Sequence, residues 1–130
     1  MNFPKFSIIL FLLIFSFSIA RAGNVSSVEF FSNSLDRNWA YTVYLPEGYK
    51  DSALRYPVVY LLHGNGGNEQ DWLLNGKIVN TLDKLISSGE IPPVIAVTPD
   101  VGTGWYVDRK EKFESAFIKD LLPEIDGRFR

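Results

Sequence analysis

The chain's only histidine is followed by three glycines, in the segment His63-Gly64-Asn65-Gly66-Gly67. Glycines let a backbone come close to a ligand, and two common phosphate-binding loops use them in this way. The spacing excludes both loops. The third glycine of a G-x-G-x-x-G motif would stand at Glu69, and the sequence has no Gly-Lys-Ser/Thr of a P-loop. A tight turn and another kind of backbone-lined site both remain open.

The segments around this loop alternate between predicted strands and helices. Residues 27–33 and 39–45 are rich in aromatic and β-branched side chains, which is typical of strands. Residues 56–62 are almost all apolar, which predicts a strand buried on both faces in the middle of a mostly parallel sheet. Residues 94–99 predict the next buried strand. Ligands meet such sheets at the carboxyl ends of the strands, which is where the glycine loop lies.

Two helices are predicted from the spacing of apolar residues. The first has its apolar stripe at Ile78, Leu82, Leu85 and Ile86. The second has its stripe at Phe113, Phe117, Leu121 and Ile125. Gly89 is expected to end the first in a left-handed cap, and Pro123 is expected to bend the second. The order of elements predicts an α/β fold, a mostly parallel sheet with flanking helices.

The first 22 residues have the pattern of a secretory signal. Lys5 supplies the basic start, residues 6–19 are apolar and uncharged, and Ala20-Arg21-Ala22 is a cleavage site before Gly23. The apolar run is short for a bilayer span, so we expect cleavage, no stable membrane anchor afterwards, and an exported periplasmic or extracellular product. The alternative is an uncleaved N-terminal anchor. Residues 23–130 are expected to form one domain.

Charge and composition narrow the partners of the exported chain. Cleavage would remove Lys5 and Arg21 from 13 basic residues, which leaves 11 against 15 acidic residues and a formal charge of −4. That balance argues against a nucleic-acid partner. The absence of cysteine excludes disulfides and a cysteine-ligated zinc. We predict no metal and no cofactor.

Five segments carry a family resemblance. They are YTVYLPEGY, YPVVYLLHGNGGNEQDW, GEIPPVIAVTPD, GWYVD and FESAFIKDLLPEID, and they cover nearly all of residues 38–130. Together they resemble the esterase D and feruloyl-esterase group of the α/β-hydrolase superfamily, which includes S-formylglutathione hydrolases and mycolyltransferases. The resemblance implies a carboxylic-ester hydrolase with a serine nucleophile, which the predicted signal would export.

The resemblance also implies roles for single residues. Asn65 would donate its backbone N–H to the oxyanion, and Gly64, Gly66 and Gly67 would keep side chains away from that site. In such enzymes the second N–H belongs to the residue after the nucleophile. If the loop is not an oxyanion loop, the glycines form only a tight turn.

Other side chains near the loop have two interpretations each. Trp105 and Tyr106, in a glycine-rich segment after a strand end, are predicted to bind substrate, with a structural role as the alternative. Trp72 is predicted to lie in the core, with a place in the lining of an acyl or aromatic pocket as the alternative. His63 is predicted to be structural, packing at the strand end and bonding a neighbouring loop, because it precedes the position of the nucleophile in the order Ser, Asp, His of the family's triad.

The sequence contains no Gly-x-Ser-x-Gly nucleophile elbow. We therefore expect a partial α/β-hydrolase fold, truncated before the nucleophile-elbow strand and inactive alone. Residues 56–62 would then be an open sheet edge, and the stripe of the second helix would lose part of its cover. Expected partners are a C-terminal half chain and, once completed, an ester substrate, either a small molecule or an acylated sugar. The alternative is a non-enzymatic secreted binding or interaction domain.

Overall fold

Four strands form one sheet in the computed structural model, which describes residues 22–130. The strands are β1 (Asn24–Ser32), β2 (Arg37–Leu45), β3 (Val58–Tyr60) and β4 (Ile95–Pro99), in the order β1-β2-β4-β3 across the sheet. The predicted signal lies outside the described residues except for Ala22. Within residues 22–130, no helix has the length and apolar character to span a membrane.

The prediction of a mostly parallel sheet is wrong, because two of the three strand pairings are antiparallel. β1 and β2 form a long hairpin, and β2 also runs antiparallel to β4. Only β3 and β4 are parallel, since the chain returns between them through the helix α2 (Ile78–Ser87). A short connection reverses a strand, whereas a parallel pair needs a crossover. The predicted order of strands and long helices is confirmed.

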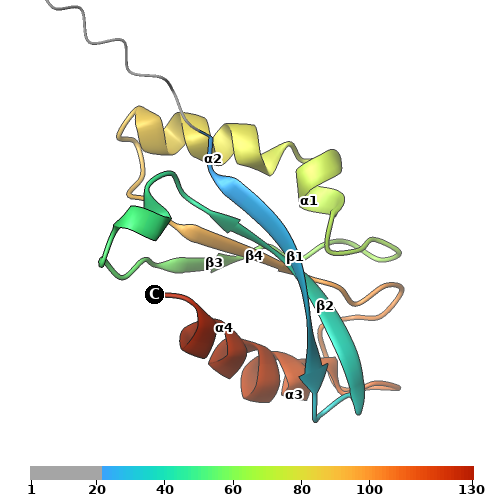
Figure 1. Ribbon diagram of the computed structural model, residues 1–130. Coiled ribbons are helices and arrows are strands. Elements are labelled where there is room, and N and C mark those ends of the chain that lie inside the picture. The colour runs from blue at the N-terminus through green and yellow to red at the C-terminus, as the bar shows by residue number, and fades with distance from the viewer. Residues whose placement is uncertain (1–21) are drawn as a thin grey trace, which may run out of the picture.

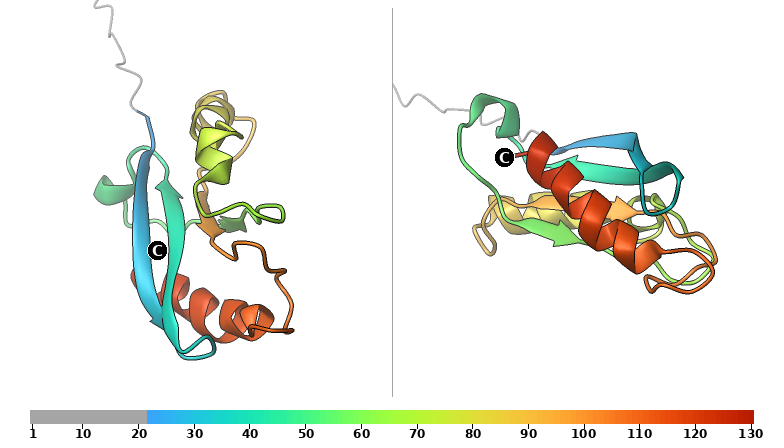
Figure 2. Two further views of the ribbon diagram at one scale, coloured as in Figure 1. Left: turned by 90° about the vertical axis from the view of Figure 1, so that its right-hand side faces the viewer. Right: turned by 90° about the horizontal axis from the view of Figure 1, so that it is seen from below.

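Helices cover both faces of the sheet (Figure 1). The short helix α1 (Asp71–Leu74) and α2 lie on one face. The other face carries a continuous segment made of α3 (Phe113–Ala116), the π-helical turn η2 (Phe117–Leu121) and α4 (Leu122–Arg128), which crosses the sheet diagonally in Figure 2. A short 3-10 helix, η1 (Tyr49–Asp51), follows β2. The loops after β3 and β4 leave the sheet at the same edge, because these strands are parallel.

Gly89 ends α2 in the left-handed conformation that the sequence predicted, with φ 74°. Its N–H donates to the carbonyl of Ile86 at 3.0 Å, and the N–H of Glu90 donates to the carbonyl of Leu85 at 3.0 Å. These two bonds form a Schellman motif. The motif directs the chain from α2 into β4. Within α2, Leu82 of the predicted apolar stripe is buried.

The predicted stripe of the second helical segment faces the sheet. Phe113, Leu121 and Ile125 are at most 2% exposed. Phe117, the fourth residue of the stripe, is only partly buried, so the expected loss of cover is limited to that position. The β1–β2 hairpin twists over the stripe, so that Trp39 and Tyr41 belong to the same core cluster.

The expected bend at Pro123 takes the form of a π-helical turn. Pro123 has no N–H to give to the carbonyl of Lys119, and in a regular helix its ring would clash with that carbonyl. The turn η2 ends two residues before Pro123 and widens the helix there. The helix continues through the proline, and Leu121 and Ile125 both stay buried.

The prediction that residues 56–62 form a strand buried on both faces is wrong. The strand β3 is only three residues long, and β4 is its single neighbour in the described sheet. Val59 is 40% exposed and Leu62 is 43% exposed. The fully buried strand is β4, which lies between β2 and β3. The apolar run therefore reflects an edge whose outer side lacks cover.

Asp120 fastens the second helical segment to the β1–β2 hairpin. Its carboxylate Oδ2 accepts from Ser32 Oγ at 2.6 Å and from the Ser34 N–H at 2.8 Å. Burial alone would raise the pKa of Asp120, but the hydrogen bonds from the two serines outweigh it and hold that pKa below its usual value. The ionised carboxylate is therefore the form that the fold stabilises.

We expect Asp120→Asn to lower the free energy of unfolding at pH 7 by about 1 to 2 kcal/mol, because a charge-assisted bond is lost. A lowered folded-state pKa means that the stabilisation is present above the ordinary aspartate pKa, about 4, and disappears as the pH falls through the folded value. Urea unfolding of the wild-type chain and the variant at pH values from 7 down to 3 measures this stabilisation. Asp126→Asn, at an exposed position of α4, is the control; equal loss in both variants would contradict the assignment.

Candidate functional site

His63 lies buried just after β3 and uses both of its ring nitrogens within the fold. The N–H of Val101 donates to Nε2 at 3.0 Å, and Nδ1 donates to the carbonyl oxygen of Gly64 at 2.7 Å. Because Nε2 accepts from an amide, the imidazole is neutral and carries its proton on Nδ1. The prediction of a structural histidine is confirmed. His63 ties the glycine loop to the loop that follows β4.

Tyr106 supports the same junction from the other side. Its hydroxyl accepts from the His63 N–H at 3.2 Å and donates to the carbonyl of Pro99 at 3.1 Å. The two rings meet edge to face, with centroids 5.7 Å apart. Burial raises the pKa of Tyr106 to about 12, so the hydroxyl keeps its proton at neutral pH. This geometry gives Tyr106 a positioning role, and its contact with substrate stays a prediction.

The backbone amides of the glycine loop fall into two groups. The N–H of Gly66 donates to the carbonyl of Gly102 at 3.0 Å, and the N–H of Gly67 donates to the carbonyl of Gly64 at 3.1 Å. The N–H groups of Gly64 and Asn65 donate to no group within residues 22–130, and both residues are exposed. The loop is thus held by its second half while its first half presents unused donors.

Two glycines of the loop are required by its geometry. Gly66 has φ 80°, which a residue with a Cβ seldom adopts. A Cβ on Gly67 would lie 2.9 Å from Nδ1 of His63 and closer still to the carboxylate of Asp71. The side chain of Asp71 is flexible, but the imidazole is fixed by its two bonds. The close approach of His63 therefore depends on glycine at position 67.

A hollow of about 330 Å³ opens beside this loop. It is lined by His63, Gly64, Asp71, Trp72, Asn75 and Gly76. The prediction that Trp72 lies in the core is wrong. It is half-buried, and its indole N–H donates to the carbonyl of Leu62 at 3.1 Å. Asp71 and Asn75 were not predicted as site residues from the sequence. The signal available was their place directly after the glycine loop, in and just beyond the short α1.

Trp105 lies apart from that hollow. It is 62% exposed and lines a second, larger hollow of about 730 Å³ at the loop between β4 and α3. Gly102 lines the same hollow, and its carbonyl is the one that accepts the Gly66 N–H. The second hollow therefore begins where the two loops meet. The structure places Trp105 on its wall, and binding of substrate there stays a prediction.

The glycine loop has the geometry of a donor loop, and the histidine beside it is fully used by the fold. His63 has no nitrogen left to act as a base, and the Asp100 carboxylate stands 3.8 Å from its Nε2. Asp100 instead accepts from the Gly102 N–H at 2.9 Å and orders that loop. No group of three or more metal-ligating side chains occurs in residues 22–130. What the arrangement offers is two free amides on a rigid turn.

The chain is similar to known esterases over most of its length. The family model described as "Putative esterase" matches residues 32–130. An endo-1,4-beta-xylanase/feruloyl esterase from Xylanibacter ruminicola is 39% identical over 120 residues, which cover 82% of this chain and 16% of that protein. The esterase Rv1288 of Mycobacterium tuberculosis is 36% identical over 113 residues, 78% of this chain and 23% of that protein.

Solved structures agree with the sequence comparisons. A ferulic acid esterase superposes with a TM-score of 0.77 at 32% identity, over 84% of this chain and 44% of that one. A mutant feruloyl esterase module from Clostridium thermocellum, complexed with sinapinate, gives 0.71 at 31% identity, over 83% and 37%. The chain thus spans less than half the length of each of these relatives. On the match over residues 32–130, the chain belongs to this esterase family.

Proposed function

We propose that this chain is the N-terminal half of an exported carboxylic-ester hydrolase of the feruloyl-esterase type. In this proposal Asn65 supplies one backbone N–H to the oxyanion, while Gly64, Gly66 and Gly67 keep the approach open. Trp105 and Tyr106 contribute to the substrate side of the site. A second chain or segment supplies the serine nucleophile, the acid, the base and the second oxyanion donor. The substrate is an aromatic acyl group esterified to an alcohol or a sugar.

One observation carries the proposal. The amides of Gly64 and Asn65 have no partner in residues 22–130, whereas the next two amides of the same loop are bonded. An oxyanion hole works because its donors are fixed before the charge develops and are not consumed by the protein itself. The bond from Gly66 to Gly102 and the two bonds of the His63 ring supply that fixation.

The purified chain alone is expected to show no hydrolysis of p-nitrophenyl acetate above the uncatalysed rate. An intact oxyanion hole without a triad gives only about 10³- to 10⁴-fold over water, and here one of the two donors is missing as well. Mixing the chain with a separate chain carrying the C-terminal half of the Xylanibacter feruloyl esterase module is expected to restore hydrolysis of methyl ferulate.

The restored activity should disappear with a serine-directed inhibitor. The C-terminal half alone is the control, and its hydrolysis should be at least about 10²- to 10³-fold slower than that of the mixture, because it lacks the Asn65 donor. Turnover by this chain alone that the inhibitor abolishes would contradict the division of labour. A stable complex of the two halves without any esterase activity would contradict the proposed function itself.

Export of the chain is part of the proposal and has its own test. Cleavage of the signal between Ala22 and Gly23 is expected, because the small-x-small site follows a basic start and an apolar run. Mass spectrometry of the exported protein measures the new N-terminus. Exported material that still carries Met1 would show that the segment is an anchor.

A further inference from the structure

The loop between β4 and α3 exposes an indole that the fold does not use. Trp39 is buried and its N–H donates to the carbonyl of Asp100, while Trp72 donates to Leu62. Trp105 is 62% exposed, and its N–H donates to no group within residues 22–130. A large apolar ring left in water loses the benefit of burial unless a ligand covers it. Trp105 therefore has the environment of a contact surface.

The backbone around Trp105 is held in place. The N–H of Gly104 donates to the carbonyl of Val101 at 2.8 Å, and a Cβ on Gly104 would lie 3.0 Å from the ring of Phe113. Farther along the loop, Asp108 accepts from the Ser115 N–H at 2.9 Å and from Ser115 Oγ at 2.6 Å. The loop is fixed at both ends, so the exposed indole is preorganised.

Three cationic side chains and two acidic ones, Asp100 and Glu111, line the same hollow in a chain whose net charge is −2. Arg37, Arg109 and Lys110 line it together with Trp105. Arg37 is occupied by Glu111 at 3.0 Å. Arg109 and Lys110 are exposed and form no ion pair with a carboxylate of the described residues. The hollow thus combines one uncovered flat ring with two unpaired cations.

We propose that this hollow binds an acidic oligosaccharide, a sugar chain that carries uronate carboxylates. One sugar ring would stack on the face of Trp105, and the carboxylates would pair with Arg109 and Lys110. The inference rests on the proposed function, in which the scissile ester belongs to a substrate that extends beyond the acyl group. Gly102 places the hollow directly beside the glycine loop.

A sugar chain suits this surface better than a free aromatic acid. Pockets for small aromatic ligands are enclosed and mostly apolar. Here the volume is about 730 Å³, and Arg109, Lys110 and Thr103 are among the lining residues. Such a wall offers polar groups to hydroxyls, while Trp105 offers a single apolar face.

The test is binding of trigalacturonate and of neutral xylotriose to the purified chain. Tryptophan fluorescence and calorimetry measure the dissociation constants. Trigalacturonate is expected to bind at least about tenfold more tightly than xylotriose, since exposed charge pairs contribute modestly but add up. The double variant Arg109→Gln/Lys110→Gln should weaken trigalacturonate binding about tenfold and leave xylotriose unchanged. Added salt should weaken only the acidic ligand.

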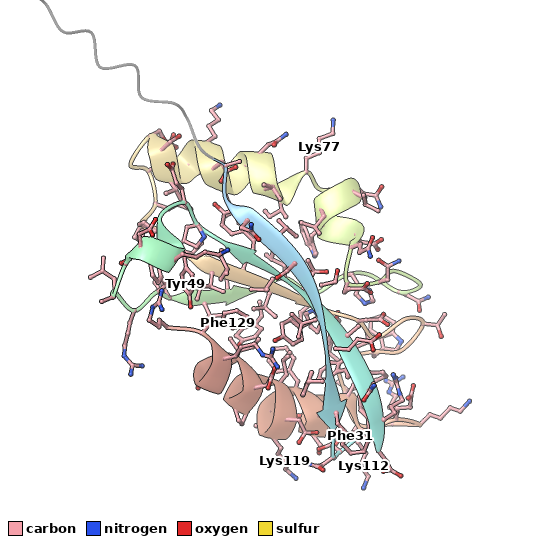
Figure 3. All side chains as sticks on the ribbon, in the orientation of Figure 1. Phe31, Tyr49, Lys77, Lys112, Lys119 and Phe129 are labelled. Atoms are coloured by element: carbon pink, nitrogen blue, oxygen red, sulfur yellow. The ribbon has the colours of Figure 1, made fainter. Side chains whose placement is uncertain are left out.

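The matched control is Lys77→Gln/Lys84→Gln, which removes the same charge from exposed positions at the start and in the body of α2. Figure 3 shows Lys77 pointing away from the protein at the start of α2, and Lys112 near the opposite end of the molecule. The control variant should bind trigalacturonate normally. Trp105→Ala should weaken both sugars, with circular dichroism confirming that it folds.

Three results would overturn the inference: equal binding of the acidic and neutral sugars, equal weakening in the control variant, or no effect of Trp105→Ala. Ferulate is the third ligand, and its binding at this hollow in place of trigalacturonate would replace the sugar with the aromatic acid. None of these measurements involves turnover. The inference can therefore fail while restored esterase activity stands, and the reverse also holds.

Discussion

In the enzyme completed by a C-terminal half, Asn65→Pro is expected to lower kcat/KM by about 10²- to 10³-fold, whereas Asn65→Ala should change it little. Proline removes the backbone N–H that faces the oxyanion, and alanine removes only the amide side chain. Asn65 does not have the positive φ that a proline ring excludes outright. The difference between the two variants therefore measures the donor.

Hydrolysis of methyl ferulate by each variant, mixed with the same C-terminal half, gives the comparison. Binding of the two halves and the thermal melt of each variant show whether the loop still folds. The loss should fall mainly on kcat, because the oxyanion charge exists only near the transition state. Equal losses for the two substitutions would show that Asn65 acts through its side chain or not at all.

Much of the loop geometry could be predicted from sequence because it is encoded locally. The place of His63 before three glycines indicates a turn after a strand, and the structure has that turn. Gly89 before Pro92 predicts the left-handed cap that is observed. In each case a few neighbouring residues determine the conformation.

The features that could not be predicted depend on contacts between residues far apart in the sequence. The apolar run at residues 56–62 predicts a buried strand, yet its burial depends on which strands flank it, and β3 has only β4. The same holds for Trp72, whose spacing gives no sign that its indole N–H bonds Leu62 at the rim of a hollow. Asp120 lies outside the apolar stripe of its helix, and nothing near it in the sequence indicates its bond to Ser32. Only the fold brings the two side chains together.

The pairing of β3 determines the second large effect that we expect, which is self-association of the purified chain. Leu61 donates its N–H to Val97 at 2.9 Å, and Pro57 accepts from the N–H of Ile95 at 3.0 Å. Backbone groups alternate sides along a strand, so those of Val58 and Tyr60 point to the open side of β3. Unpaired strand groups beside exposed apolar side chains favour pairing with another chain.

Size-exclusion chromatography with light scattering is expected to show dimers or larger assemblies of the purified chain. Val59→Lys should shift the chain toward monomer, because a charge on an edge strand discourages pairing and Val59 is already 40% exposed. Val25→Lys is the control on β1, the other edge, where it should leave the association unchanged. A shift toward monomer in Val25→Lys, and not in Val59→Lys, would place the contact on β1.

A partner strand that pairs with β3 should stabilise the fold and prevent self-association. Each large apolar side chain that a partner strand covers gains up to about 1.5 to 3 kcal/mol, against a typical net stability of about 5 to 15 kcal/mol. The free energy gained by covering Val59 and Leu62 is therefore a substantial share of the net stability. The matching C-terminal half should both raise the melting temperature and abolish self-association. A monomer that melts cooperatively without any partner would show that the edge of β3 is tolerated as it stands. That outcome would favour a non-enzymatic binding domain, because a chain that needs no second half has no structural reason to recruit one.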